Sequence, residues 1–204
     1  MKNELESGLE QLGISYAHEQ FGKLLQFIDL LIKWNKVYNL TAVRKPEDMV
    51  SLHLLDSLSL LAHLKNFDRL LDVGSGAGLP GIPLAIFKPD QQFVLLDSNV
   101  KKTRFIQQAI IDLKLQNVQV VHSRVEKYTP SVPFDCITTR AFATIAETLK
   151  LVEHLLAKQS RVLFMKSNTV ESELNQTKSN FTHEIIKLSV PGIEANRRLV
   201  VLSR

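Results

Sequence analysis

Apolar residues recur at helical spacing through residues 18–64. One amphipathic stretch covers residues 21–32 and a second covers residues 49–61, with apolar side chains three and four positions apart. The break between them, YNLTAVRKPED, ends in Pro46 followed by two acids, which is the composition of the first turn of a helix. The pattern therefore predicts packed helices over this part of the chain.

From residue 68 the pattern changes to short apolar runs that alternate with helical stretches. The runs RLLDV, QFVLLD, NVQVV, FDCITT and SRVLFM predict strands, and helices are expected near residues 81–88, 99–114 and 143–157. Such alternation is typical of a parallel sheet with crossover helices. Two last runs, HEIIKLSV and RRLVVLS, are joined by a short segment and should pair antiparallel. The predicted fold is α/β, in which a helical extension (residues 1–66) precedes a domain (residues 67–204) with a mostly parallel sheet and an antiparallel C-terminal hairpin.

The segment LLDVGSGAGLPGIP, residues 70–83, places a glycine-rich turn directly after the first predicted strand. In α/β sheets such a turn lets ligand atoms approach the backbone, because glycine has no Cβ. Leu79 stands where the dinucleotide fingerprint has a small residue, and no Walker lysine follows, so neither phosphate motif is supported. Asp97 ends the second strand, where a carboxylate can accept hydrogen bonds from both hydroxyls of a ribose.

These features favour a ligand that carries adenosine without a phosphate, and S-adenosylmethionine has that chemistry. The ammonium group of its amino-acid tail could face Asp72, directly or through water. From the turn alone, a tight connection without a ligand stays open as the alternative.

Composition and charge narrow the classes of function. Cys136 is the only cysteine, so the chain forms no internal disulfide, and we predict no metal site. No apolar run is long enough to cross a bilayer and the first residues lack a signal-peptide pattern, so we expect a cytoplasmic protein without membrane contact. The net charge of +4 arises in residues 67–204, where Lys and Arg outnumber Asp and Glu, and it is compatible with nucleic acid as a partner.

Six segments spread over almost the whole chain carry a family resemblance: WNKVYNLTAVR, HLLDSL, DVGSGAGLPGIPLA, LLDSNVKKTRF, SRVE and TTRAFA. Together they resemble the bacterial small-subunit rRNA (guanine-N7) methyltransferase family, RsmG, also called glucose-inhibited division protein B. The resemblance implies a Rossmann-like class I methyltransferase fold with a seven-stranded sheet and S-adenosylmethionine as methyl donor. It also implies that the acceptor is N7 of the guanine at position 527 of 16S rRNA, in the small ribosomal subunit or an assembly intermediate of it. The chain departs from the family pattern at Ser167, where glycine is usual, and at Arg198, where histidine is usual.

The resemblance further implies which residues contact the cofactor. They lie in the glycine turn, after the second strand, beside the adenine and at the end of the fourth strand. Together with the acid and the other glycines of the turn, the predicted set is Asp72, Gly74, Gly76, Gly78, Leu79, Asp97, Ser98, Asn99, Val125, Glu126 and Arg140.

N7 of guanine has an in-plane lone pair and carries no proton, so its methylation needs alignment of the reactants and no general base. No convincing acid/base pair lies near the turn, and we name no catalytic residue beyond two positioning candidates, Arg124 and Arg140. We interpret Arg140 as a ligand of the cofactor carboxylate or of the guanine edge rather than as a member of an ion pair. The A-form major groove hides N7, so the target must lie in a loop or be turned out of its stack.

Basic side chains near the predicted site are the candidates for RNA binding. They are Arg44, Lys101, Lys102, Arg104, Arg124, Lys166, Arg197 and Arg198, and Lys36 and Lys45 could add a second contact near the amino end. A solvated helix face is the alternative for the group after Asp97. No exposed apolar stripe demands a partner subunit, so we expect a monomer.

Other interpretations are weaker. His53, Asp56 and Ser57 are reminiscent of a hydrolase triad, but on one helix Ser57 points away from the other two, so we predict a packing and positioning role. Cys136 is expected to be a small buried apolar residue within its strand. The competing functions are a methyltransferase acting on another RNA or small substrate, a nicotinamide-dependent oxidoreductase and a non-enzymatic RNA-binding module.

Overall fold

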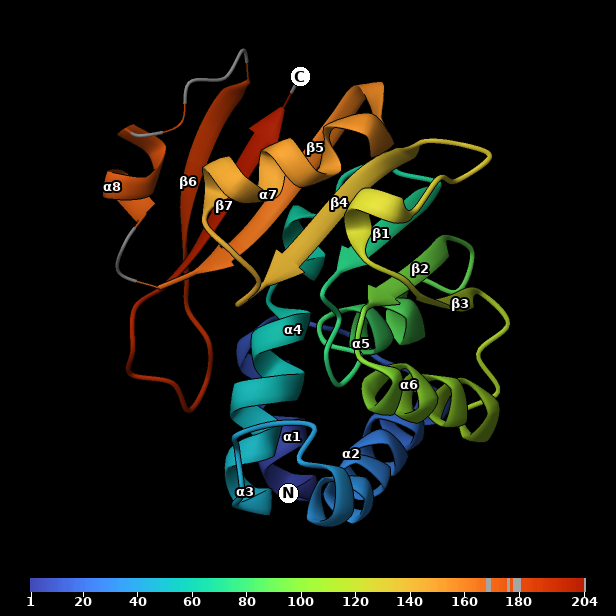
Figure 1. Ribbon diagram of the computed structural model, residues 1–204. Helices are drawn as coiled ribbons and strands as arrows, with labels where there is room; N and C mark the ends of the chain where they lie inside the picture. The colour runs from blue at the N-terminus through green and yellow to red at the C-terminus, as the bar shows by residue number, and fades with distance from the viewer. Residues whose placement is uncertain (168–169, 176, 178–180, 204) are drawn as a thin grey trace.

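The computed structural model describes residues 1–167, 170–175, 177 and 181–203. Within these residues seven strands form one sheet in the order β3-β2-β1-β4-β5-β7-β6 (Figure 1). The strands are β1 Arg69–Val73, β2 Gln92–Asp97, β3 Val118–His122, β4 Phe134–Arg140, β5 Leu156–Lys166, β6 Thr182–Leu188 and β7 Arg197–Ser203. Every apolar run predicted to be a strand is one.

The central strand of the sheet is β1, which pairs in parallel with β2 on one side and β4 on the other. The sheet extends in parallel to β3 and β5, and β7 lies antiparallel between β5 and β6. This confirms the predicted antiparallel hairpin. The order of the strands reverses between β1 and β4, and open α/β sheets bind ligands outside the carboxyl ends of the strands at such a point.

The helices surround this sheet on both faces. They are α1 Lys2–Gln11, α2 His18–Tyr38, α3 Pro46–Met49, α4 Asp56–Leu58, α5 Gly81–Phe87, α6 Val100–Asp112, α7 Ile145–Val152 and α8 Val170–Asn175. A π-helical segment, η1 Val50–Leu55, leads into α4, and 3-10 turns form η2 Leu61–His63, η3 Val125–Lys127 and η4 Glu153–Leu155. The helices expected after residue 80 are confirmed, whereas α1, α8 and the π-helical turn were not expected. None of the helices in the described part of the chain is long and apolar enough to span a bilayer.

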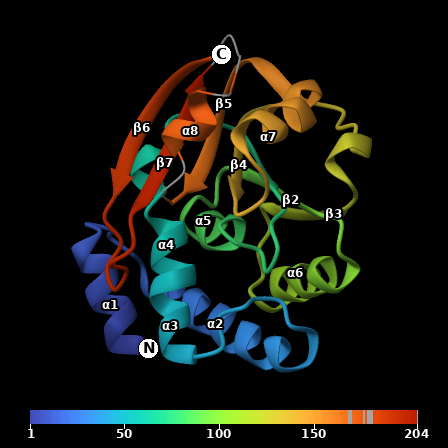
Figure 2. The ribbon, with the colours of Figure 1, turned by 60° about the vertical axis from the view of Figure 1, so that its left-hand side comes forward.

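The two faces of the sheet bury alternate residues of the central strands, as the strand periodicity requires. Leu70 and Leu95 belong to the core that includes the N-terminal helices, α5 and α6. Leu71 and Val94 belong to the core beneath α7. Both views show α1, α2 and α6 gathered in the lower half of the molecule and α7 in the upper half (Figures 1 and 2).

Residues on both sides of the predicted boundary at residue 66 contribute to one core. The rings of Phe27 in α2 and Phe105 in α6 lie 6.1 Å apart, and Phe67 packs edge-on against Phe93 of β2 at 5.8 Å. Gln20 also donates from its side-chain amide to the carbonyl of Ile86 in α5. The division into a helical extension and a methyltransferase domain therefore stays a prediction.

Candidate functional site

The glycine turn begins where β1 ends. Gly74, Gly76 and Gly78 have φ values of +68°, +58° and +76°, which L-residues with a side chain rarely adopt. The backbone N–H groups of Gly74 and Ser75 donate to the carbonyl of Leu96 at 2.8 and 3.1 Å, so the turn is tied to the end of β2. The turn is thus a fixed, left-handed loop at the carboxyl edge of the sheet.

Asp72, the acid before the turn, is fully buried. Its Oδ2 accepts the N–H of Gly81 at 3.0 Å, while Oδ1 has no hydrogen-bond partner among the described residues. Burial raises the pKa of Asp72 to about 7, against the opposing effect of the Gly81 N–H. A buried oxygen without a donor is costly, and a donor from a bound ligand or water would remove that cost.

Asp97 is held at the end of β2 by two backbone donors. Gly76 donates its N–H to Oδ2 at 2.9 Å and Asn99 donates its N–H to Oδ1 at 2.8 Å. Nζ of Lys102 lies 4.0 Å from Oδ2. The carboxylate is therefore fixed in one orientation, and each oxygen retains a lone pair for another donor.

A first cavity of about 310 Å³ opens beside these residues. Its size lies at the lower end of the range for small-molecule sites. It is lined by Gly74, Leu96, Asp97, Ser98, Lys102, Ser123, Arg124, Val125, Glu126, Ala141, Phe142 and Leu151. Segments predicted separately to contact one ligand thus meet around one space.

Not every predicted cofactor residue lines the first cavity. Asp72, Gly76, Gly78, Leu79, Asn99 and Arg140 lie outside its wall. Leu79 is 4% exposed and belongs to the core, and a Cβ on Gly78 would meet Ile82 at 2.9 Å. Asn99 caps α6 by accepting the N–H of Lys101. Contact of these six residues with a ligand stays a prediction.

Phe142 is a site residue that the sequence did not single out. Its ring is 39% exposed, and a Cβ built on Gly74 would lie 2.5 Å from its Cδ2. Ala141 before it has φ +51°, an uncommon value that places the segment after β4 over the glycine turn. The available signal was the large apolar residue in the RAFA motif directly after a strand end.

A second cavity of about 530 Å³ shares Ala141 with the first. It is lined by Val43, Leu52, His53, Asp56, Arg140, Ala141, Met165, Lys166, Ser167, Glu173 and Arg197. Nη1 of Arg140 donates to Oδ2 of Asp56 at 3.0 Å, and Nε of Arg197 donates to Oδ1 at 3.1 Å. Arg140 is therefore a member of an ion pair, the alternative that the sequence favoured less, because the N-terminal segment brings a buried carboxylate to the end of β4, and its contact with a ligand stays a prediction.

His53 in this wall is neutral. Burial lowers its pKa to about 4, and the nearby Arg140 adds to that effect. Ser57 donates its hydroxyl to the carbonyl of His53 at 2.6 Å and is fully buried. The three residues of the HLLDS segment therefore form no hydrolase triad, and the positioning interpretation stays a prediction.

The RNA-binding candidates fall into two groups. Lys101, Arg104 and Arg124 are exposed, and their side chains make no hydrogen bond or ion pair with another described residue. The others have partners: Arg44 binds Asn39, Lys102 lies near Asp97, Lys166 pairs with Glu173, Arg197 with Asp56 and Arg198 with Glu171. Ser167, which departs from the family pattern, is exposed and lines the second cavity, and the residues directly after it lie outside the described ranges.

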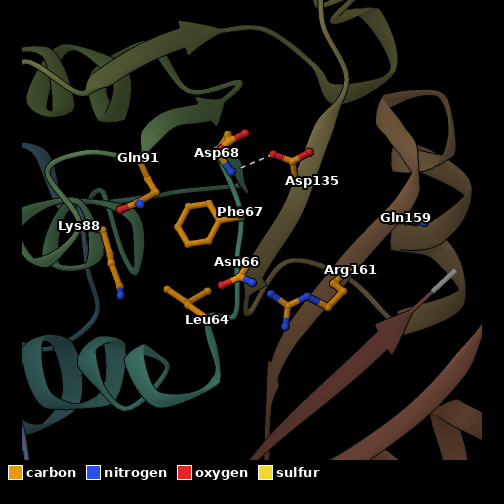
Figure 3. Close-up of a pocket in the computed structure, with 9 residues that line it drawn as sticks. All are labelled: Leu64, Asn66, Phe67, Asp68, Lys88, Gln91, Asp135, Gln159 and Arg161. Atoms are coloured by element: carbon orange, nitrogen blue, oxygen red, sulfur yellow. Dashed lines mark hydrogen bonds between the residues drawn. The ribbon is translucent and has the colours of Figure 1, made fainter.

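A third cavity, of about 470 Å³, lies at the opposite edge of the sheet (Figure 3). Asp135 accepts the backbone N–H of Asp68 there, and Arg161 donates to the carbonyls of His63 and Lys65. None of the predicted site residues lines it. It surrounds the amino ends of the parallel strands, away from the edge where such sheets bind ligands.

The sequence model of the family described as "GidB: rRNA small subunit methyltransferase G" matches residues 20–201. The chain is 48% identical over 203 residues to "Ribosomal RNA small subunit methyltransferase G" of Pseudomonas paraeruginosa, covering 99% of this chain and 95% of that protein. It is 50% identical over 202 residues to the protein of the same name in Methylobacillus flagellatus, covering 99% and 98%. The chain belongs to the rRNA small subunit methyltransferase G family. It is an S-adenosylmethionine-dependent rRNA methyltransferase, and the oxidoreductase and non-enzymatic alternatives are excluded.

Solved structures of low sequence identity share the fold of this family member. A SAM-dependent methyltransferase from Aquifex aeolicus superimposes with a TM-score of 0.59 at 18% identity, covering 78% of this chain and 98% of that one. The O-methyltransferase TomG from Streptomyces achromogenes, solved with SAM, has a TM-score of 0.59 at 15% identity, covering 87% and 89%. The class I methyltransferase fold is thereby confirmed.

The carboxyl edge of this methyltransferase G sheet fits S-adenosylmethionine by three observations. Gly74 lines the first cavity in a left-handed backbone conformation, Asp97 is a fixed acceptor for ribose hydroxyls, and Asp72 retains a buried oxygen without a donor. The carboxylate oxygens of Asp72 and Asp97 are hydrogen-bond acceptors. They match a ligand that donates from hydroxyl and ammonium groups and carries no phosphate.

Proposed function

We propose that this rRNA methyltransferase transfers a methyl group from S-adenosylmethionine to N7 of the guanine at position 527 of 16S rRNA. The acceptor is the small ribosomal subunit or an assembly intermediate of it, and the enzyme works in the cytoplasm as a monomer. The exposed large apolar side chains, among them Val37, Ile111 and Val132, come from separate parts of the described chain. This scatter supports the monomer, because stable interfaces bury a contiguous apolar core.

The observation that carries the proposal is the pair of adjoining cavities at the carboxyl edge of the sheet. Gly74 and Asp97 line the first cavity, where the methyl donor would bind. The second offers Arg140, Arg197 and a neutral His53 to an electron-rich acceptor. Ala141 lies in the wall of both, so a donor in one cavity and a nucleotide in the other would meet beside it.

The chemistry of guanine N7 suits a site without a free base. Bound S-adenosylmethionine supplies an electrophilic methyl group on sulfur. The N7 lone pair forms the new C–N bond, the S–CH₃ bond breaks with its electrons going to sulfur, and no proton moves. His53 has a hydrogen-bond partner on each ring nitrogen and stays neutral, so it takes no part in proton transfer. The protein therefore contributes binding, orientation and exclusion of water, which can lower the barrier greatly on their own.

The test is transfer of a labelled methyl group to small subunits that lack their native N7 methylation, followed by chain cleavage at 7-methylguanine. We expect one cut, at position 527, and no incorporation into subunits that already carry the modification. Protein-free 16S rRNA, tested in parallel, shows whether the folded subunit is required. Incorporation at another base, or a labelled product that resists cleavage at 7-methylguanine, would contradict the proposal.

A further inference from the structure

Asp56 joins two arginines that come from distant parts of the chain. It is the first residue of α4, while Arg140 ends β4 and Arg197 begins β7. The Asp56 side chain is 4% exposed, and its two oxygens accept from Arg140 at 3.0 Å and from Arg197 at 3.1 Å. The arrowheads of β4 and β5 point toward the N-terminal helices, so the carboxyl edge of the sheet faces α4 (Figure 1). One carboxylate thus fixes both guanidinium groups at the wall of the second cavity.

The observed hydrogen bonds leave donors unused on both arginines. Nη1 of Arg140 also donates to the carbonyl of Leu52 at 3.0 Å, so this nitrogen has two acceptors. A guanidinium has five N–H donors. Nε and Nη2 of Arg140, and Nη1 and Nη2 of Arg197, have no acceptor in the described part of the chain. A ligand with acceptor oxygens in the second cavity would meet two guanidinium groups that are already oriented.

No other described carboxylate in this cavity can replace Asp56. Glu173 accepts from Nζ of Lys166 at 2.9 Å and from the N–H of Ile145 at 2.8 Å. Without Asp56 the two guanidinium groups would repel each other in a part-buried site and lose their common orientation. The carboxylate therefore acts on the shape and charge of the cavity without needing to touch a ligand.

We propose that Asp56 is a positioning residue for methyl transfer, which holds Arg140 and Arg197 in the orientation that binds acceptor oxygens of the target nucleotide. This inference rests on the function proposed above. The oxygens are guanine O6 or the phosphate beside it. Arginine commonly binds guanine through O6 and N7 together, which would block the reacting nitrogen. A guanidinium whose orientation is fixed by Asp56 can reach an oxygen while N7 stays free.

The experiment compares Asp56→Asn with the unmodified protein in methyl transfer to unmethylated small subunits. We expect kcat/KM for the subunit to fall about 10- to 100-fold, as displaced groups in an aligned site do, while the Kd for S-adenosylmethionine changes little and Tm falls because a buried ion pair has lost one partner. Asp135→Asn is the matched control, because Asp135 is a part-buried carboxylate at the opposite edge of the sheet. It should retain the activity of the unmodified protein. Asp56→Glu keeps the charge and should recover part of the lost activity.

A double-mutant cycle separates positioning from support of the fold. If Asp56 acts through Arg197, adding Asp56→Asn to Arg197→Ala costs much less in kcat/KM than Asp56→Asn costs alone. The salt dependence of kcat/KM identifies the oxygen, because removing an interaction with a phosphate lowers the log–log slope by about one, whereas removing one with O6 leaves the slope unchanged. Arg197→Ala keeps the ion pair of Asp56 with Arg140. Its kcat/KM and salt slope therefore test the role of Arg197 even if Asp56→Asn folds poorly.

The outcomes are distinct. Full activity of a folded Asp56→Asn protein, or activity losses that add in the cycle, would overturn the inference and leave the proposed function intact. Losses in Tm and cofactor affinity that account for the loss in activity would also overturn it. Absence of N7 methylation by the unmodified protein would overturn the proposed function and this inference together.

Discussion

Thr41, in the loop that joins α2 to α3, and His53 of η1 lie 3.0 Å apart, Oγ1 to Nε2. Nδ1 of the same ring lies 3.0 Å from the carbonyl of Leu52, which can only accept, so Nδ1 carries the proton. Nε2 is then an acceptor, and Thr41 donates its hydroxyl to it. The ring is held as one neutral tautomer behind the carbonyl that also binds Arg140.

This arrangement predicts that His53 makes the protein less stable in acid. The pKa of His53 is lowered from 6.5 to about 4, so between these pH values the unfolded chain binds a proton that the folded chain does not. The free energy of unfolding should fall by up to about 3 kcal/mol as pH drops through that window. Urea unfolding of the unmodified protein and of His53→Gln at several pH values measures this, and the variant should show the flatter curve.

His18→Gln is the control for loss of an imidazole at an exposed position. It leaves the buried ring of His53 in place, so the loss of stability in acid that His53 causes should remain. A His53→Gln curve with the same slope as the unmodified protein would contradict the neutral, buried assignment.

Asp72 should act on stability in the opposite direction. Its pKa is raised from 3.8 to about 7, so the folded chain retains a proton that the unfolded chain loses between these values. The free energy of unfolding contributed by this group therefore falls as pH rises from 3.8 to about 7, by up to about 4 kcal/mol. Asp72→Asn should remove this part of the pH dependence, as measured by the same urea titrations, and an unchanged difference curve would contradict it.

The same ionisation should govern cofactor affinity, if Asp72 faces the ammonium group of S-adenosylmethionine. A bound cation favours the ionised carboxylate, so the affinity should rise up to about tenfold between about pH 5.5 and about pH 7. Calorimetric titration should find a weaker, pH-independent Kd for Asp72→Asn. Equal affinity of the unmodified protein at both pH values would remove Asp72 from the binding site.

The strands and the closing hairpin were predictable because each is indicated by the pattern of apolar residues within its own short segment. RLLDV and QFVLLD bury alternate residues on two faces, and the short link between the last two runs permits only antiparallel pairing. The helix α1 escaped prediction because Leu5 and Leu9 are its only large apolar residues, and although both are buried, two positions give little helical periodicity. The π-helical turn is set by tertiary contacts of its residues, which the spacing of apolar residues does not encode.

The site was predictable where it follows strand ends and hidden where it depends on packing between distant segments. Gly74 and Asp97 follow β1 and end β2, so the sheet brings them together. Asp56 lies 84 positions from Arg140 and 141 from Arg197, and only the docking of the N-terminal helices on the sheet makes these ion pairs. The position of the exposed Phe142 ring depends on the positive φ of Ala141, and the sequence does not indicate that backbone conformation.

The exposed pair Lys101 and Arg104 should contribute to RNA affinity without affecting the cofactor. They lie three positions apart at the start of α6, on one exposed face, while Lys102 of the same turn lines the first cavity. Replacing both with glutamate should lower kcat/KM for small subunits and reduce its log–log salt slope by about one for each phosphate that the variant no longer binds. Lys158→Glu, an exposed change near the amino end of β5, serves as the control. If the double variant has the same kcat/KM and salt slope as this control, Lys101 and Arg104 only form a solvated helix face.

Gly74 and Gly13 allow the conformational cost of a turn glycine to be separated from its role toward the ligand. Their φ values are close, at +68° and +66°, so the backbone conformation alone should cost an alanine at either position about 1–2 kcal/mol of the free energy of unfolding. Around Gly13 nothing lies within 4 Å of a new Cβ, whereas at Gly74 the Cβ would meet the ring of Phe142. Gly13→Ala should therefore bind S-adenosylmethionine with unchanged Kd, and Gly74→Ala should bind it at least about tenfold more weakly.

The ring of Phe142 can be removed to find what the added methyl group obstructs. In Gly74→Ala/Phe142→Ala the clash with the ring is gone, but the Cβ still occupies the wall of the first cavity. If the cofactor approaches the backbone at Gly74, its affinity stays low in the double variant and Tm recovers. Recovery of affinity together with Tm would mean that Gly74 only makes room for Phe142, and the close approach of the ligand to the turn would be wrong.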